Sequence, residues 1–244
     1  MDTDTVLQHE AEAPNQAEER AESSLARQAL LCGGRLGPLW QQEQGWQLIL
    51  ADHHRRCFMS YKPSVFSGIV SETWYSQCAK SLPWERPWVK EKRLPRKACW
   101  LTMPDVPLPY RYGGREWPCH AMPAWFQVLT AQVCAACGIK DPPNSCNANM
   151  YESGDDMVGW HADNEPLFKA DKQDALIISL SLGASRTFAY RLNAQPDKVK
   201  DLRLHDGDLF TMEGLTQKYY KHAVRKERRD VLPRINLTWR WIVR

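Results

Sequence analysis

The sequence predicts an α+β protein that is mostly β, with a sandwich or barrel core such as a jelly roll and supporting helices in its N-terminal half. Short β-favouring runs follow one another closely after Gly138, with turn-forming residues and no helix-like stretch between them. Helical patterns occur only before Gly138. With 13 Gly and 16 Pro in 244 residues, the composition is that of an ordinary packed protein and excludes collagen-like and low-complexity chains.

The first 27 residues form an acidic tail. They contain seven acidic residues against Arg20 and Arg27, a net charge of −5, so the total of +3 leaves +8 on residues 28–244. The tail is poor in large apolar residues, and we expect it to be disordered or a frayed helix. The basic remainder, predicted to be a single domain over 28–244, makes a polyanionic partner plausible, although solvated surface cations would give the same balance.

The N-terminal half combines short apolar runs, two helical patterns and a segment rich in Pro, Trp and Arg. The run at 53–56 (HHRR) is interpreted as a solvated turn rather than a metal site. Residues 71–79 have helical character and open with a sequence that resembles a capping box, and residues 123–137 predict an amphipathic helix. Prolines exclude long helices from 83–118, which leaves strand fragments and loops whose aromatic and cationic residues suit nucleic acid.

The C-terminal half predicts seven short strands. They cover residues 146–151, 157–161, 175–182, 187–192, 208–212, 219–224 and 234–243. The run at 175–182 is the longest apolar stretch, has strand length and contains two Ser, so we expect no membrane span.

A possible metal site lies among these strands. His161 and Asp163 are two residues apart, so on extended backbone their side chains point to the same side. His222 follows on a later predicted strand and could be a third ligand. Two His and one carboxylate form the facial triad typical of non-haem Fe(II) oxygenases, but a His-x-Asp pair also arises by chance.

The last predicted strand strengthens this hypothesis. By alternation, Ile235, Leu237, Trp239 and Trp241 share one face, and the opposite face carries Arg234, Asn236, Thr238 and Arg240. Inward-facing Arg side chains need anions, which a dicarboxylate such as 2-oxoglutarate supplies, whereas a surface strand would leave them solvated. Asn149 and Tyr151, also two apart, would add polar groups to the same cavity.

Together these residues resemble the AlkB-like Fe(II)/2-oxoglutarate dioxygenases, which oxidatively demethylate nucleic acid. The resemblance covers roughly residues 95–244 and is strongest to eukaryotic DNA-repair members. It rests on NMY at 149–151, HADNE at 161–165, SLSLGASRTFAYR at 179–191, GDLFTMEGLTQKYYKHAV at 207–224 and RINLTWR at 234–240. It implies a double-stranded β-helix (jelly roll) core that uses Fe(II), 2-oxoglutarate and O2.

The resemblance also implies roles for individual residues. Iron would bind His161, Asp163 and His222, and 2-oxoglutarate would bind Asn149, Tyr151, Arg234, Asn236, Thr238 and Arg240. A flipped-out base would stack on Tyr112 or its neighbour Tyr110, within a nucleotide-recognition region at 83–118. Asn164 stands where the family usually has Asp, which leaves Glu165 as the acidic candidate for the base edge. Arg186 could border the pocket or be structural.

The function implied is an oxidative demethylase that removes N-methyl lesions such as 1-methyladenine and 3-methylcytosine from DNA, or RNA, releasing formaldehyde, succinate and CO2. Alternatives are a dioxygenase acting on RNA or protein and a catalytically silent nucleic-acid-binding module. A separate hypothesis is a zinc site formed by Cys134 and Cys137 with Cys146 downstream and Cys119 and His120 upstream. We expect a monomer that is intracellular, in the nucleus if the source is eukaryotic and otherwise in the cytoplasm. The acidic N-terminus shows no signal-peptide pattern, which favours this location.

Overall fold

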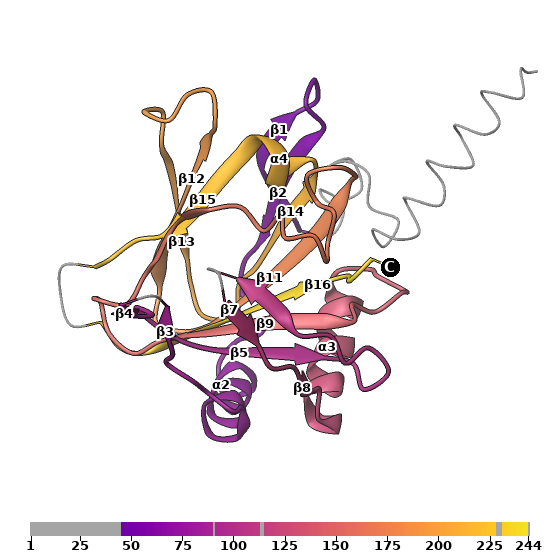
Figure 1. Cartoon of the computed structure of the whole chain (residues 1–244), viewed down its shortest axis with the longest axis vertical. Helices are drawn as coiled ribbons and strands as arrows, with labels where there is room; N and C mark the ends of the chain where they lie inside the picture. Colours follow the sequence, from indigo (N-terminus) through magenta and orange to yellow (C-terminus); the bar gives the residue numbers. More distant parts are fainter. Residues whose placement is uncertain (1–44, 90, 113–114, 228–230, 244) are drawn as a thin grey trace, which may run out of the picture.

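A computed structural model describes residues 45–243 except 90, 113–114 and 228–230. The acidic tail predicted at 1–27 lies outside the described residues. The described part contains two facing β-sheets, with two helices against the outer face of the larger sheet (Figure 1). Among the described residues, no helix is long and apolar enough to span a membrane.

The larger sheet has eight strands in the order β1-β2-β14-β11-β16-β9-β5-β8. Neighbours run antiparallel except β5 and β8, which are parallel. The central strands bury apolar side chains on the helix side and point polar ones toward the smaller sheet. The strands are β1 (Gln47–Asp52), β2 (Cys57–Lys62), β14 (Leu209–Gly214), β11 (Ala175–Gly183), β16 (Arg234–Arg240), β9 (Ser145–Tyr151), β5 (Lys97–Thr102) and β8 (His120–Ala121).

The smaller sheet has four antiparallel strands, β10 (Val158–His161), β15 (Tyr220–Val224), β12 (Arg186–Leu192) and β13 (Lys200–Leu204), in that order. Phe188 and Tyr190 on β12 pack against Ile177, Phe210 and Met212 of the larger sheet. Two largely antiparallel sheets that enclose a shared interior confirm the predicted jelly-roll architecture.

Helices α2 (Ile69–Ser81) and α3 (Ala124–Ala136) cover the outer face of the larger sheet (Figure 1). Phe126, Leu129 and Val133 of α3 pack in one core with Leu237 and Trp239 of β16. Both helices lie where the sequence predicts them. A short third helix, α4 (Thr216–Tyr219), precedes β15.

The predicted capping box is wrong. Helix α2 begins two residues before Ser71, after Gly68, whose φ of 55° a residue with a side chain rarely adopts. No side chain caps the helix, and the Ser71 hydroxyl instead donates to Asp206 Oδ1 at 2.6 Å. Ser71 therefore ties the helix to a loop of the sheet.

Two small ribbons occupy the segment that is rich in Pro, Trp and Arg. One pairs β3 (Trp88–Val89) with β4 (Lys92–Arg93), and the other pairs β6 (Tyr110–Tyr112) with β7 (Arg115–Trp117). Trp100, Tyr110, Trp117 and Phe168 form a separate cluster that joins the second ribbon to the sheet. The two ribbons are therefore separate from the two main sheets and pack beside them.

One further prediction is confirmed, and one strand was missed. The run at 53–56 forms a turn between β1 and β2 in which His53 and His54 are exposed, as predicted. Strand β13 was not predicted, because its sequence, KDLRL, is charged and lies at the open edge of the smaller sheet.

Candidate active site

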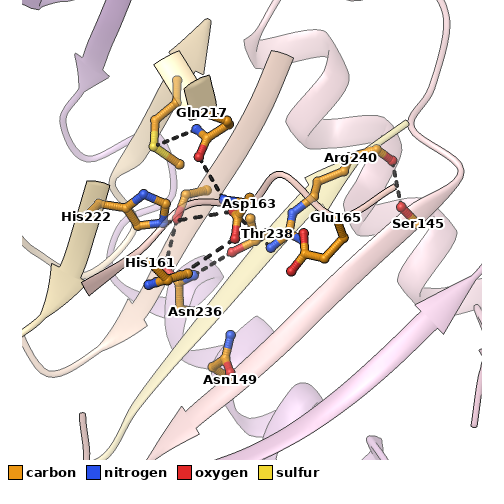
Figure 2. A network of polar contacts seen from close by, with 12 residues as sticks. Ser145, Asn149, His161, Asp163, Glu165, Gln217, His222, Asn236, Thr238 and Arg240 are labelled. Atoms are coloured by element: carbon orange, nitrogen blue, oxygen red, sulfur yellow. Dashed lines mark hydrogen bonds and ion pairs between the residues drawn. The ribbon is translucent and has the colours of Figure 1, made fainter. Parts of the chain in front are cut away.

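Three potential metal ligands meet between the two sheets. His161 ends β10 and lies directly opposite His222 of β15, and Asp163 follows two residues later (Figure 2). Asp163 Oδ1 lies 3.6 Å from His161 Nε2, and its Oδ2 lies 3.9 Å from His222 Nε2. Ligand atoms of all three lie within 4.8 Å of one another. One ion could therefore contact all three, in the arrangement of a facial triad.

Neighbouring groups fix the orientation of these ligands. The backbone N–H of Asp163 donates to Gln217 Oε1 at 2.9 Å, and Gln217 Nε2 in turn donates to Met212 Sδ at 3.3 Å. His161 Nδ1 lies 2.8 Å from the Gly159 carbonyl. With the proton on Nδ1, this contact leaves Nε2 as the lone-pair donor that faces Asp163, the usual way in which a metal-binding His is held.

The charges of the triad also suit a cation. Burial lowers the pKa of His222 to about 3 and also lowers the pKa of His161, so both rings are neutral near pH 7. Burial alone would raise the pKa of Asp163, but several neighbouring groups, of which Arg240 has the largest effect, together outweigh burial and lower this pKa. Neutral imidazoles and an ionised carboxylate are the protonation states that a metal requires.

Strand β16 forms the floor of the cavity. The face that it turns to the cavity is the polar one, as the alternation of its residues predicts. Ile235, Leu237 and Trp239 are fully buried in the helix-side core. The opposite face, together with neighbouring β9, lines the cavity; its residues are Asn149, Tyr151, Arg234, Asn236, Thr238 and Arg240. The structure therefore brings all six predicted co-substrate residues to the cavity that also holds the triad.

Arg234 carries the clearest sign of a missing anion. The residue is 1% exposed, and Nη2 donates to Ser181 Oγ and Asn236 Oδ1, each at 2.8 Å. Nε and Nη1 are buried with no hydrogen-bond partner among the described residues. Burial lowers the pKa of Arg234 to about 10, so the group remains charged. A buried guanidinium with two unused N–H groups is matched by a carboxylate.

Arg240 is neutralised within the protein. Its Nη2 forms an ion pair with Asp163 Oδ2 at 2.9 Å, and its Nη1 lies 3.7 Å from Glu165 Oε2 (Figure 2). The Tyr110 hydroxyl donates to the other oxygen of Glu165, and burial raises the pKa of both Glu165 and Tyr110. Arg240 therefore links the metal ligand Asp163 to the Glu165–Tyr110 pair at the side of the cavity.

The predicted substrate residues are spread more widely. Tyr110 is buried, lines the cavity and stacks on Trp100, with ring centroids 4.7 Å apart. Tyr112 lies in β6, but its side chain lies outside the described residues. Asn164 is exposed, whereas Glu165 turns inward toward Tyr110.

Arg186 has a structural position. It is 1% exposed and donates to the backbone carbonyls of Ser153, Asp156 and Arg225 at 2.6–3.0 Å. It does not line the cavity of the triad. Of the two roles left open for this residue, the structure favours the structural one.

Two residues that bond the predicted cavity residues escaped the sequence analysis. Arg96 lines the cavity and donates from Nε to Asn149 Oδ1 at 2.5 Å. Ser181 bonds Arg234 from β11, and alternation within the apolar run 175–182 could have placed it on the cavity side. Arg96 lies on a bend after Pro95, where no periodic pattern indicates direction.

The alternative zinc site has no support in the described part of the chain. There, the only cluster of three or more potential metal ligands is His161, Asp163 and His222. Cys134 and Cys137 are buried in the helix-side core, where burial raises the pKa of Cys134 to about 11.

Comparison with known proteins identifies the family. A profile described as the 2OG-Fe(II) oxygenase superfamily matches residues 58–240. The chain belongs to this superfamily. Membership explains the donor set: two neutral His and one carboxylate suit Fe(II), and the unused side of Arg234 suits a carboxylate of 2-oxoglutarate.

Individual relatives place the chain near the AlkB-like oxygenases. It is 32% identical over 72% of its length to the human alpha-ketoglutarate-dependent dioxygenase alkB homolog 3, covering 64% of that protein, and 33% identical to the mouse protein over 68%, covering 59%. It is 26% identical over 71% of its length to DNA oxidative demethylase ALKBH2 of Arabidopsis thaliana, covering 62% of it. These matches confirm the AlkB-like resemblance, and the chain spans about 60% of the length of these relatives.

A solved structure confirms the fold. The structure of OsALKBH1 superposes on 80% of this chain and on all of its own chain, with a TM-score of 0.56 and 18% sequence identity. At 18% identity the similarity establishes the fold alone and gives no information on the substrate.

Proposed function

We propose that the protein is an oxidative demethylase that removes N-methyl lesions, such as 1-methyladenine and 3-methylcytosine, from DNA by direct reversal. The observation that carries the proposal is the pairing of a buried His-Asp-His triad with the unused guanidinium N–H groups of Arg234 in one cavity. The names of the AlkB-like relatives, which include DNA oxidative demethylase, support the substrate class.

The protein's residues would divide the work as follows. His161, Asp163 and His222 would hold Fe(II), which with 2-oxoglutarate and O2 supplies the oxidation of the N-methyl group to formaldehyde, with succinate and CO2 as co-products. Arg234 would anchor the distal carboxylate of 2-oxoglutarate. The aromatic and aliphatic cluster of Phe188, Phe210 and Met212 lines the other side of the cavity and excludes water from it.

The ribbon β3–β4 supports nucleic acid as the substrate. Trp88 is 56% exposed, and the Arg93 guanidinium carbon lies 5.7 Å from the centre of its ring. An exposed aromatic beside a cation suits base stacking next to a phosphate. Together with the net charge of +8 on residues 28–244, this supports 83–118 as the nucleotide-recognition region.

The test uses the full chain with Fe(II), 2-oxoglutarate and O2. It is incubated with oligonucleotides bearing 1-methyladenine or 3-methylcytosine, as single- and double-stranded DNA and as RNA. We expect loss of one methyl mass on DNA with matching succinate, and neither with His161→Ala, whose melting temperature should stay close to that of the wild type.

Each other outcome selects an alternative. Methyl loss on RNA alone would make RNA the substrate. Succinate formation without methyl loss on any oligonucleotide would favour a protein substrate. Oligonucleotide binding with no succinate would indicate a catalytically silent binding module. Normal turnover by His161→Ala would overturn the metal assignment.

Two further parts of the proposal concern the protein in the cell. We propose a monomeric protein in an intracellular compartment, the nucleus in a eukaryotic source and the cytoplasm otherwise. The basic charge of residues 28–244 and a nucleic-acid substrate support this location.

A further inference from the structure

We propose that Arg96 serves both substrates at once: its Nε orients Asn149 for 2-oxoglutarate, and its two terminal nitrogens bind the phosphodiester of the target nucleotide. This inference rests on the proposed function, because it needs a nucleic-acid strand at the cavity. It adds a specificity residue that lies outside the triad and outside the polar face of β16.

The position of Arg96 connects two parts of the molecule. It lies on the bend between ribbon strand β4 and sheet strand β5. The bend is pinned because the backbone N–H of Met157 donates to the Pro95 carbonyl at 2.8 Å, just before β10. Arg96 is therefore held between the ribbon that carries Trp88 and the strand that carries His161.

The inner side of Arg96 determines how Asn149 faces the cavity. Nε donates to Asn149 Oδ1 at 2.5 Å, so this oxygen is occupied. The Nδ2 group of Asn149 is then the end that points toward the triad, as Figure 2 shows. An amide N–H2 directed there can only donate, which suits an oxygen of a keto acid.

The outer side of Arg96 has no anion. Arg96 is 6% exposed, donates the one hydrogen bond to Asn149, and forms no ion pair within the described part of the chain. Arg240, by contrast, has Asp163 and Glu165 within 4 Å. The terminal N–H groups of Arg96 have no hydrogen-bond partner among the described residues and are not fully enclosed, so they are open to an anion that is not part of the protein.

The anion that Arg96 binds can be inferred by assigning the other anions of the reaction first. The distal carboxylate of 2-oxoglutarate is matched by Nε and Nη1 of Arg234, and the keto acid end belongs at the metal. The anion that remains is a phosphodiester of the nucleic acid. Arg96 also lines a second small cavity with Trp100, Tyr110 and Trp117, on the side of ribbon β6–β7.

A neutral-backbone oligonucleotide tests the phosphate contact without turnover. Fluorescence anisotropy measures binding to metal-loaded protein of a methylated single strand, either unmodified or with one methylphosphonate next to the target nucleotide, on its 5′ or its 3′ side. For the wild type, we expect one of the neutral linkages to weaken binding about tenfold, the loss of a charge-assisted hydrogen bond. For Arg96→Gln, that linkage should make less than a twofold difference.

A second readout follows the co-substrate. Calorimetric titration with 2-oxoglutarate should give a dissociation constant at least about fivefold higher for Arg96→Gln, because Gln lacks the Nε–H group that donates to Asn149. Arg96→Lys should keep most of the sensitivity to the neutral linkage and still bind 2-oxoglutarate weakly. Lys200→Gln, which removes one exposed cation from β13, is the matched control and should behave as the wild type in both assays.

The outcomes separate this inference from the proposed function. If Arg96→Gln keeps the full methylphosphonate penalty, or if only its 2-oxoglutarate affinity changes, the shared role is wrong while demethylation by the wild type stands. If the wild type neither binds nor demethylates any oligonucleotide, the proposed function itself fails. Equal melting temperatures of wild type and Arg96→Gln show that the change is local.

Discussion

The cavity wall and the two ribbons are built differently, and of the described ribbon residues only Tyr110 lines the cavity. The wall consists of β9, β11 and β16, in which β16 pairs along its full length with β9 and its apolar residues Ile235, Leu237 and Trp239 are fully buried. The ribbons pair two or three residues at a time, and one of them exposes Trp88.

The difference matches the two kinds of ligand. The groups proposed to hold 2-oxoglutarate, which are the same for every substrate, lie on strands that cannot move without disrupting the core. Trp88, proposed to stack on a base, lies exposed on the two-residue ribbon β3–β4, where a change of side chain should cost little stability. A substitution in the wall should therefore impair co-substrate use, and one in a ribbon should impair nucleic-acid binding alone.

The largest effect should follow Arg234→Gln. Removal of a buried charge from its anion costs about 2 kcal/mol or more, so KM for 2-oxoglutarate should rise about 30-fold or more. The oligonucleotide dissociation constant should stay within twofold, because the change lies in the wall. Succinate assays and anisotropy measure the two constants, and Arg234→Lys should recover part of the loss. Equal loss of both affinities would break the division between wall and ribbon.

A smaller effect concerns the pH dependence of the metal-free protein. The pKa of His222 is about 3 in the fold and near 6.5 in the unfolded chain, so below pH 6.5 the unfolded state binds more protons. The free energy of unfolding should then fall by up to about 1.4 kcal/mol per pH unit on acidification from this one group. Urea unfolding in EDTA between pH 7 and pH 5 measures it. A slope that is the same in His222→Gln would contradict this account.

The smallest effect should come from the ribbon. Trp88→Ala should weaken binding of single-stranded oligonucleotides about fivefold or more, since stacking of one base contributes about 1–3 kcal/mol. KM for 2-oxoglutarate and the melting temperature should not change. Val128→Ala, which shortens an exposed side chain on α3, is a control on the opposite side of the larger sheet. A change in 2-oxoglutarate affinity upon Trp88→Ala would show that the ribbon and the wall are coupled.

The site could be predicted where backbone alternation determines side-chain direction. His161 and Asp163 are two residues apart, and so are Arg234 and Asn236, so the rule that alternate residues share a face placed them correctly. Side chains on irregular backbone could not be placed by this rule. Arg96 lies on a bend, and Gln217 reaches the backbone N–H of Asp163 from the short helix α4.

Much of the fold could be predicted for the same reason, and the prediction failed at similar places. Apolar runs located β11 and β16, and helical spacing located α2 and α3. The charged edge strand β13 carries no such pattern because only one of its five residues is buried. The start of α2 was wrong because Ser71 bonds a distant loop rather than the first turn of its own helix. Such tertiary partners cannot be inferred from neighbouring residues.

The pairing of β10 with β15 has a mechanical consequence. Strand β10 is an edge strand that meets β15 at only two register positions, Val158 with Val224 and His161 with His222, with an irregularity between them. An ion bound by both His residues would act as a cross-link that completes this weak seam. Loss of the ion would then allow the end of β10 to fray. We therefore expect proteolysis of the metal-free protein to begin at this strand, and bound ion to protect it.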